Sequence, residues 1–167
     1  VYRVGSVSKL FTDMAIMQRV EKGEIDLDEP IQTYLPNFNP LNPYKTPITL
    51  RQMMSHRSGL LREPRKGNYF TDDEISLKAT VESIIPSKLI HEPESKTKYS
   101  NAAIAVVGYT LEVLYQTPYV KYMQKHILEK IGMSNSAFAP NKKIISRLAK
   151  ANMWSYDNRI FAAPTFE

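Results

Sequence analysis

The chain has 167 residues, 43% of them hydrophobic and 23% charged, which allows one domain with a substantial core. It contains no cysteine, which excludes disulfides, thiolate nucleophiles and cysteine-ligated zinc, and no apolar run approaches the roughly 18 residues of a membrane span. The net charge is +5, but basic residues such as Arg62, Arg65 and Lys66 form no stripe with aromatic residues, so we expect solvated surface charge and no nucleic-acid partner.

The first predicted elements are a strand end over residues 1–4 and a long helix over about residues 7–22. Gly5 separates them, Ser6 is placed to cap the helix, and Gly23 follows its last turn. The helix has an apolar face at helical spacing, made by Leu10, Met14, Ile16, Met17 and Val20.

The middle of the chain predicts short helices between irregular loops. A helix over residues 31–34 is stopped by Pro36, and Thr49 caps another over residues 50–55. A polar loop follows over residues 61–73. Asp72 or Asp73 then opens a helix that runs to about residue 85.

The second half predicts longer helices and one hairpin. After a polar loop over residues 91–98, Asn101 opens a strongly apolar helix over residues 102–115. Further helices are expected over residues 118–131 and 142–149, and a hairpin over residues 151–163. The chain is therefore predicted to be mostly helical, with strand signals only at its two ends.

Ser6-Val7-Ser8-Lys9 is the first candidate for catalytic chemistry. Positions i and i+3 share a helix face, so the Lys9 amine can lie beside the Ser6 hydroxyl. A serine hydroxyl is a weak nucleophile until a base takes its proton, and a helix N-terminus favours the negative charge of an oxyanion. The tetrapeptide at residues 95–98 has the same spacing, but it lies in a polar loop and has no helix after it.

Tyr99-Ser100-Asn101 is the second candidate. A tyrosine can relay a proton between the serine and a leaving group, and an asparagine amide can hold a substrate carbonyl and hydrogen-bond the lysine. The tripeptide at residues 156–158 also fits this pattern, but we interpret it as the turn of the hairpin. Tyr99 lies instead where a polar loop meets the apolar helix, which would hold it rigidly.

The three histidines, His56, His91 and His126, show no metal-ligand spacing, and the sequence has no G-x-S-x-G motif. These absences argue against a metalloenzyme and a Ser-His-Asp hydrolase, and we expect no metal and no cofactor. His56 is interpreted as a structural hydrogen-bonding residue at a helix end.

Several segments in the same order resemble class C β-lactamases and their esterase and D-peptidase relatives, within the wider group of penicillin-binding proteins. The resemblance covers most of the chain. It is carried by residues 2–12 with Ser6 and Lys9, residues 27–36, residues 48–60, Tyr99-Ser100-Asn101 with the helix after it, and residues 127–133.

The resemblance implies an α/β (α+β) fold of the serine β-lactamase and DD-peptidase type. Residues 1–167 would be a partial domain, mostly α-helical, with most of the antiparallel sheet missing. Within it, residues 1–23 would hold the strand end and nucleophile helix, residues 24–140 a helical subdomain, and residues 141–167 the return toward the sheet.

The resemblance also implies roles for four residues. Ser6 would be the acylated nucleophile, Lys9 its proton partner, Tyr99 the general acid/base and Asn101 a substrate-positioning residue. The Ser6 backbone N–H would form half of an oxyanion hole. The other half comes, in this family, from a strand with a Lys- or His-Thr/Ser-Gly motif, which we do not find here. We therefore expect residues 1–167 alone to be inactive.

The expected substrate is a small molecule or peptide that carries an acyl group: a D-peptide, a β-lactam or an ester. The resemblance favours a periplasmic, secreted or cell-envelope location. Both chain ends resemble cuts through a longer protein, so targeting signals and membrane association stay open. The alternative is a non-catalytic binding or regulatory relative that keeps the fold. A Lys- or His-Thr/Ser-Gly strand elsewhere in the protein would favour catalysis over this alternative.

Overall fold

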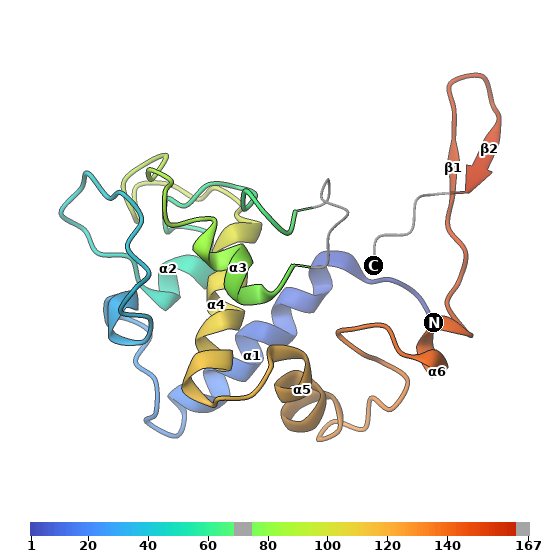
Figure 1. Cartoon of the computed structure of the whole chain (residues 1–167), viewed down its shortest axis with the longest axis horizontal. Coiled ribbons are helices and arrows are strands. Elements are labelled where there is room, and N and C mark those ends of the chain that lie inside the picture. Colours follow the sequence, from blue (N-terminus) through green and yellow to red (C-terminus); the bar gives the residue numbers. More distant parts are fainter. Residues whose placement is uncertain (69–74, 163–167) are drawn as a thin grey trace.

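The computed structural model describes residues 1–68 and 75–162, and its helices pack around one central helix (Figure 1). In chain order the elements are the 3₁₀ turn η1 (Gly5–Val7), α1 (Ser8–Val20), the 3₁₀ turn η2 (Ile31–Thr33), α2 (Leu50–Met54), α3 (Leu77–Glu82), α4 (Asn101–Leu114), α5 (Tyr119–Met123), the π-helical turn η3 (Gln124–Leu128), α6 (Lys142–Ile145), β1 (Asn152–Trp154) and β2 (Ile160–Ala162).

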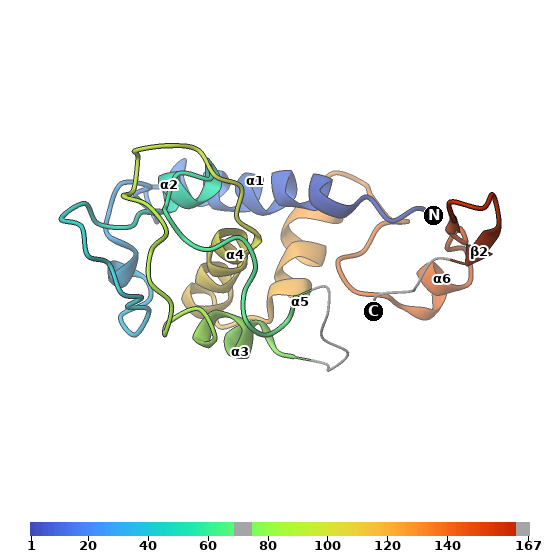
Figure 2. The same cartoon turned by 90° about the horizontal axis from the view of Figure 1, so that it is seen from above.

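The central helix is α4, which packs against α1, α2, α3 and α5. Figure 2 shows α4 between α1 and α3. Its sequence is apolar almost all round, as expected for a helix covered on every side. Gly108 allows α5 to approach closely, because a Cβ there would lie 3.2 Å from the ring of Tyr119. The fully buried residues of α4 are Ala102, Ala103, Val106, Val107, Thr110 and Leu111.

Capping residues explain where several helices begin. Thr49 and Gln52 form a reciprocal capping box at α2, which confirms the predicted cap. The cap of α4 is Ser100, whose hydroxyl accepts from the Ala103 N–H, so Asn101 is the first helical residue and not the cap. The cap of α3 is Ser76, and the helix ends at Glu82, before the predicted end near Ile85. Asp72 and Asp73, predicted to open this helix, lie outside the described residues.

The start of the chain differs from the prediction in two respects. Residues 1–4 form no strand, because no described segment pairs with them as a ladder; the carbonyl of Val1 accepts instead from the N–H of Ala149. Ser6 does not cap α1, because its hydroxyl is engaged by other side chains and lies within η1. The helix itself ends at Val20, and Gly23 follows it with a positive φ of 69°.

The apolar residues of α1 lie on two faces, where the sequence predicted one. Ile16 is fully buried against the core, as is Ala15. Leu10, Met14 and Met17 remain 66%, 42% and 40% exposed on the other face. No described element covers that second face, since α4 and α5 pack on the first.

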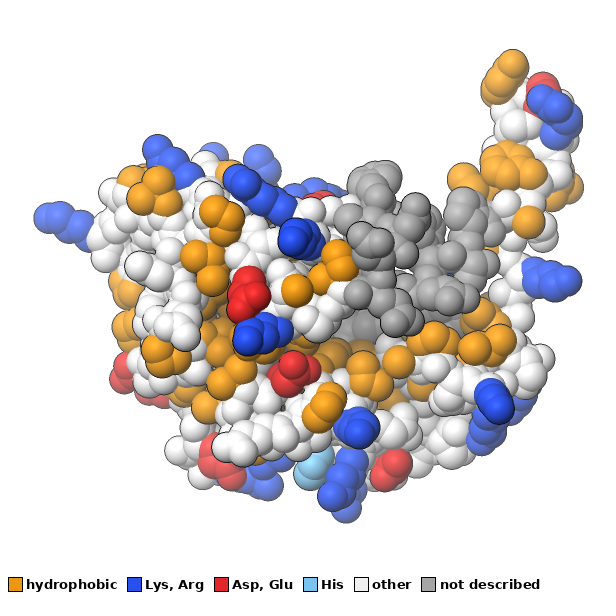
Figure 3. All heavy atoms as spheres, viewed as in Figure 1, with side chains coloured by type: hydrophobic (Ala, Val, Ile, Leu, Met, Phe, Trp, Pro, Cys, Tyr) orange, Lys and Arg blue, Asp and Glu red, His pale blue; other side chains and the backbone are white. Residues whose placement is uncertain are grey.

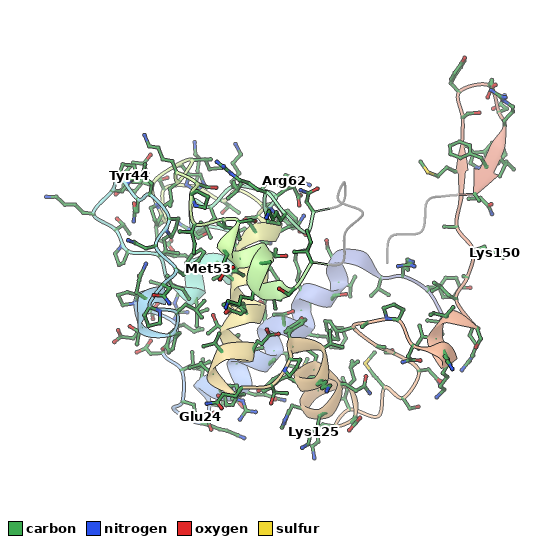
Figure 4. All side chains as sticks on the ribbon, in the orientation of Figure 1. Glu24, Tyr44, Met53, Arg62, Lys125 and Lys150 are labelled. Carbon is green, nitrogen blue, oxygen red and sulfur yellow. The ribbon has the colours of Figure 1, made fainter. Side chains whose placement is uncertain are left out.

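An ion-pair and aromatic cluster holds the C-terminal end of α1. The Arg19 side chain, almost buried, donates from Nε to the Tyr122 hydroxyl at 2.6 Å and pairs with Glu24 at 3.3 Å. The Tyr115 hydroxyl donates to the same Glu24 carboxylate, and the Arg19 guanidinium lies 4.4 Å from the Tyr115 ring centroid. Figure 4 labels Glu24 at this end of α1. The buried charge is therefore paired and hydrogen-bonded, as its burial requires.

The end of the chain forms a hairpin that projects from the helices (Figure 1). β1 and β2 pair antiparallel with Met153 opposite Phe161, which confirms the predicted hairpin over the described residues. Hydrophobic side chains gather on it in Figure 3, and Trp154 is 67% exposed. The basic helix before it, α6, is only four residues long, shorter than predicted, and Asn141 caps it. Among residues 1–68 and 75–162, no helix has the length and apolarity to cross a membrane.

Two glycines with positive φ give a matched stability prediction. A Cβ at Gly59 would lie 2.2 Å from the carbonyl oxygen of His91, whereas a Cβ at Gly23 meets nothing within 4 Å. Gly23→Ala should cost about 1–2 kcal/mol for the left-handed backbone alone. Gly59→Ala adds a backbone overlap and should cost about 1–3 kcal/mol more. Urea unfolding of both variants tests this, and equal costs would contradict the close approach of the His91 carbonyl.

Candidate active site

The Ser6 hydroxyl receives two side-chain hydrogen bonds. Lys9 Nζ donates to Ser6 Oγ at 3.0 Å, and the Tyr99 hydroxyl donates to the same oxygen at 2.7 Å. Gly5, with a φ of 52°, lets the chain turn sharply into η1 immediately before the serine. The 3₁₀ turn and the first turn of α1 then place Lys9 on the face of Ser6, as the i, i+3 spacing predicts.

Tyr99 precedes α4 and is held between charged and aromatic groups. The His56 ring packs against it, with ring centroids 4.4 Å apart. Lys9 Nζ lies 5.1 Å from the Tyr99 ring centroid, within the range of a cation–π contact. Tyr99 therefore contacts the predicted lysine with its ring and the predicted serine with its hydroxyl.

His56 is fixed at the end of α2 and its geometry assigns its tautomer. Its backbone is left-handed, with a φ of 59°, and its carbonyl accepts from the Lys98 N–H at 2.8 Å. The ring Nδ1 lies 3.3 Å from the Ser100 N–H. Since Nδ1 accepts that bond, the neutral ring carries its proton on Nε2. The interpretation of His56 as a hydrogen-bonding residue at a helix end agrees with these contacts.

The positive charges around the site act on Tyr99 and His56. Partial burial by itself raises the pKa of Tyr99, but hydrogen bonds with Lys9 and Ser6 and the charges of Lys9 and Arg62 outweigh it and lower the pKa below its ordinary value. Burial, and secondly the charge of Lys9, lower the pKa of His56. The site therefore eases the loss of the Tyr99 proton and disfavours an imidazolium at His56.

Asn101 is not joined to the other three predicted residues by a hydrogen bond. Its amide Nδ2 donates to Glu63 Oε1 at 2.7 Å, and its Oδ1 is shielded with no hydrogen-bond partner among the described residues. A carboxylate only accepts, so the partner settles which end of the amide faces Glu63. The structure thus brings Ser6, Lys9 and Tyr99 together, whereas Asn101, at the start of α4, is bound to Glu63.

Three neighbours of the site were not predicted. Arg62 and Glu63 come from a loop that the sequence marks only as polar, and their place depends on backbone contacts with α4. Asp13 follows Lys9 by one helical turn, and burial raises the pKa of its carboxyl to about 6, although the charge of Lys9 opposes the rise. The i, i+4 spacing of Lys9 and Asp13 was the one available signal.

The duplicate motifs have no such environment. Ser95 lies in a loop, where its hydroxyl donates to the Glu92 carbonyl at 2.7 Å. Tyr156 is fully exposed beside the turn of the hairpin. Among the described residues, no three His, Asp or Glu side chains gather in a way that could hold a metal ion. The hydrogen-bonded hydroxyl of Ser6, with a cation and a tyrosine of lowered pKa, is an arrangement suited to nucleophilic catalysis.

Comparison of the sequence with known proteins identifies a family and several relatives. Residues 1–166 match the sequence model of the Beta-lactamase family. Beta-lactamase-like protein 2 of Dictyostelium discoideum is 39% identical over 141 residues, which cover 81% of this chain and 26% of that protein. The chain thus spans about a quarter of the length of this relative.

Solved structures share the fold. EstCE1, described as a hydrolase with promiscuous acyltransferase activity, is 26% identical with a TM-score of 0.82, over 98% of this chain and 45% of that one. A β-lactamase/D-alanine carboxypeptidase from Yersinia pestis is 26% identical with a TM-score of 0.76, over 88% of this chain and 43% of that one. FmtA from Staphylococcus aureus, 21% identical, has a TM-score of 0.84 over 98% of this chain and 44% of that one.

The position of Lys9 can be tested through the histidine ring. His56 should titrate below its ordinary pKa of 6.5, and Lys9→Met should move its midpoint upward because one nearby positive charge is removed. The midpoint should stay below the ordinary value, because burial is the larger cause. Carbon–proton NMR of the histidine rings measures this. His126 is the internal control, since burial and other cations lower its pKa. An unmoved His56 midpoint would show that Lys9 does not lie where the structure places it.

Proposed function

The chain belongs to the β-lactamase family, and on this premise we propose that it is a serine hydrolase that forms an acyl-enzyme on Ser6. The family and its solved relatives are hydrolases of the β-lactamase and penicillin-binding type, and their fold is the predicted one. The observation that carries the proposal is the pair of hydrogen bonds that Ser6 Oγ accepts from Lys9 and Tyr99.

In the proposed acylation step Ser6 Oγ bonds to the acyl carbonyl carbon and gives up its proton. We propose Tyr99 as the acceptor, because its oxygen lies 2.7 Å from Ser6 Oγ and its lowered pKa eases the prior loss of its own proton. Lys9, the proton partner of Ser6 and Tyr99, donates to Ser6 Oγ. Its ammonium group stabilises the negative charge on the serine and tyrosine oxygens while the proton moves between them. The proton then passes from Tyr99 to the leaving group as the acyl bond breaks.

The start of α1 supports the negative charge on the substrate. Ser6 lies in the turn that leads into this 13-residue helix, where backbone N–H groups and the positive end of the helix dipole favour an oxyanion. We propose the Ser6 N–H as one oxyanion donor. In the family that the sequence resembles, the second donor comes from a strand with a Lys- or His-Thr/Ser-Gly motif. We propose that another part of the protein supplies such a strand.

The substrate class proposed is an acyl compound: an ester, a D-peptide or a β-lactam. Relatives whose names describe a hydrolase with acyltransferase activity and a β-lactamase/D-alanine carboxypeptidase support this range. Asn101 remains a proposed substrate-positioning residue, which would act through an amide that Glu63 already holds. Because the chain covers about a quarter of its curated relative, the activity of the whole protein is part of this proposal. A cell-envelope or secreted location is proposed on the same basis.

Two serines with the same spacing to a lysine provide a matched test. Ser6→Ala in the full-length protein should lower the rate of ester hydrolysis by several orders of magnitude, because it removes the nucleophile and leaves the core untouched. Ser95→Ala removes a hydroxyl that bonds only within its own loop, and should leave the rate unchanged. Steady-state hydrolysis of a chromogenic ester and a chromogenic β-lactam measures both. Hydrolysis retained in Ser6→Ala would point to another nucleophile, whereas no hydrolysis by the wild-type protein would favour the non-catalytic alternative.

A further inference from the structure

Arg62 is fixed beside the candidate site by its backbone. Its carbonyl accepts from the N–H groups of Asn101 at 2.7 Å and Ala102 at 3.1 Å, which ties it to the start of α4. The Ser100 hydroxyl donates to the preceding carbonyl, of Leu61, at 2.6 Å. Figure 4 labels Arg62 at the end of α4 where that helix begins. Tyr99 lies in the chain just before the start of α4, so the backbones of Arg62 and Tyr99 are both held at the same end of this helix.

The Arg62 side chain lies over the tyrosine that contacts the nucleophile. Its guanidinium carbon is 5.3 Å from the Tyr99 ring centroid, and the Tyr99 hydroxyl in turn donates to Ser6 Oγ. The side chain is nevertheless 67% exposed. A ligand that approaches Ser6 therefore meets a positively charged planar group on the Tyr99 side.

Glu63 occupies only part of the hydrogen-bonding capacity of Arg62. The two residues form one contact, between Arg62 Nε and Glu63 Oε1 at 3.4 Å. The same Glu63 oxygen accepts a shorter bond, of 2.7 Å, from Asn101 Nδ2. An arginine carries five N–H donors in a fixed fork, and the terminal nitrogens of Arg62 have no partner among the described residues. Within the described residues these donors are therefore available to a ligand.

We infer that Arg62 is a specificity-determining residue that binds a carboxylate of the substrate. The inference rests on the proposed function, because it takes the ligand of this site to be an acyl compound that approaches Ser6. A guanidinium fork matches the two oxygens of a carboxylate, which a lysine ammonium does not, and such contacts are stronger than neutral hydrogen bonds. The site would then favour acyl substrates with a free carboxylate over neutral substrates of the same length.

Arg62 also affects the pKa of Tyr99, and this electrostatic effect can be measured separately from carboxylate binding. Its charge is one of the causes that lower the pKa of Tyr99. Removal of that charge should raise this pKa and shift the acidic limb of the pH–rate profile upward, equally for charged and neutral substrates. Carboxylate binding, in contrast, affects only the charged substrate. The ratio of the rates for the charged and the neutral substrate, each taken on the plateau of its pH–rate profile, therefore measures carboxylate recognition alone.

The test uses two chromogenic esters of equal chain length: the mono-4-nitrophenyl ester of adipic acid and 4-nitrophenyl hexanoate. In full-length protein at low salt, kcat/KM for the adipate half-ester should exceed that for the hexanoate by about tenfold or more, beyond the ratio of their spontaneous hydrolysis rates. Arg62→Gln should abolish this preference, chiefly through KM. Arg62→Lys should restore it only in part, because the fork is lost although the charge remains.

Arg65→Gln is the matched control, since it removes the same charge from an exposed position in the same loop. It should leave the preference intact. An equal loss in Arg65→Gln and Arg62→Gln would overturn the inference in favour of a general surface potential, as would a wild-type protein without preference.

Calorimetric titration of the adipate half-ester into Ser6→Ala, with and without Arg62→Gln, measures binding where Ser6 cannot react. Weaker binding with Arg62→Gln supports the inference even if the wild-type protein never acylates Ser6, a result that would overturn the proposed function alone. Unchanged binding in the double variant overturns the Arg62 assignment whether or not Ser6 is acylated.

Discussion

The hydrogen bond between the Tyr99 and Ser6 hydroxyls joins points of the chain that are 93 residues apart in sequence. It can form only if the start of α1 and the start of α4 lie together, and the packing of these two helices provides that. The apolar residues of α4 pack against α1 and α3 in the core. This packing fixes the start of α4, and with it the position of Tyr99. At the far end of α1, the Arg19 cluster with Tyr122 and Glu24 fixes the same helix again.

Local electrostatics follow from that geometry. Hydrogen bonds with Lys9 and Ser6, and the positive charges of Lys9 and Arg62 beside the ring, outweigh burial and lower the pKa of Tyr99. Burial, and secondly the charge of Lys9, lower the pKa of His56. A phenol that releases its proton more readily is useful beside a nucleophile, whereas an imidazole that stays neutral can keep accepting the Ser100 N–H. Lys9 thus acts both on the tyrosine of the proposed chemistry and on the histidine that packs against it.

Sequence reasoning succeeded where the determinants are local. The spacing of Ser6 and Lys9 on one helix face, the capping box of Thr49 and the hairpin near the C-terminus follow from neighbouring residues alone. Tyr99 was chosen over the matching tripeptide at residues 156–158 because an apolar helix follows it, and the structure places it against Ser6.

Other features depend on contacts that no local pattern reveals. Ser6 is predicted to cap a helix, but its hydroxyl oxygen instead accepts hydrogen bonds from Lys9 and from the hydroxyl of Tyr99, which is distant in sequence. A strand was expected over residues 1–4, yet a strand requires a partner, and none of the described segments supplies one as a ladder. Arg62 was interpreted as scattered surface charge, because only the backbone bonds of its loop to α4 bring it to the site.

The central claim is that Ser6, activated by Lys9 and Tyr99, takes up an acyl group. Peptide-mapping mass spectrometry of the full-length protein after exposure to a penicillin or an activated ester tests it most directly. We expect one covalent adduct, with the mass of the acyl group, on the peptide that contains Ser6. An adduct confined to the peptide that contains Ser95, or no adduct with either reagent, would contradict it.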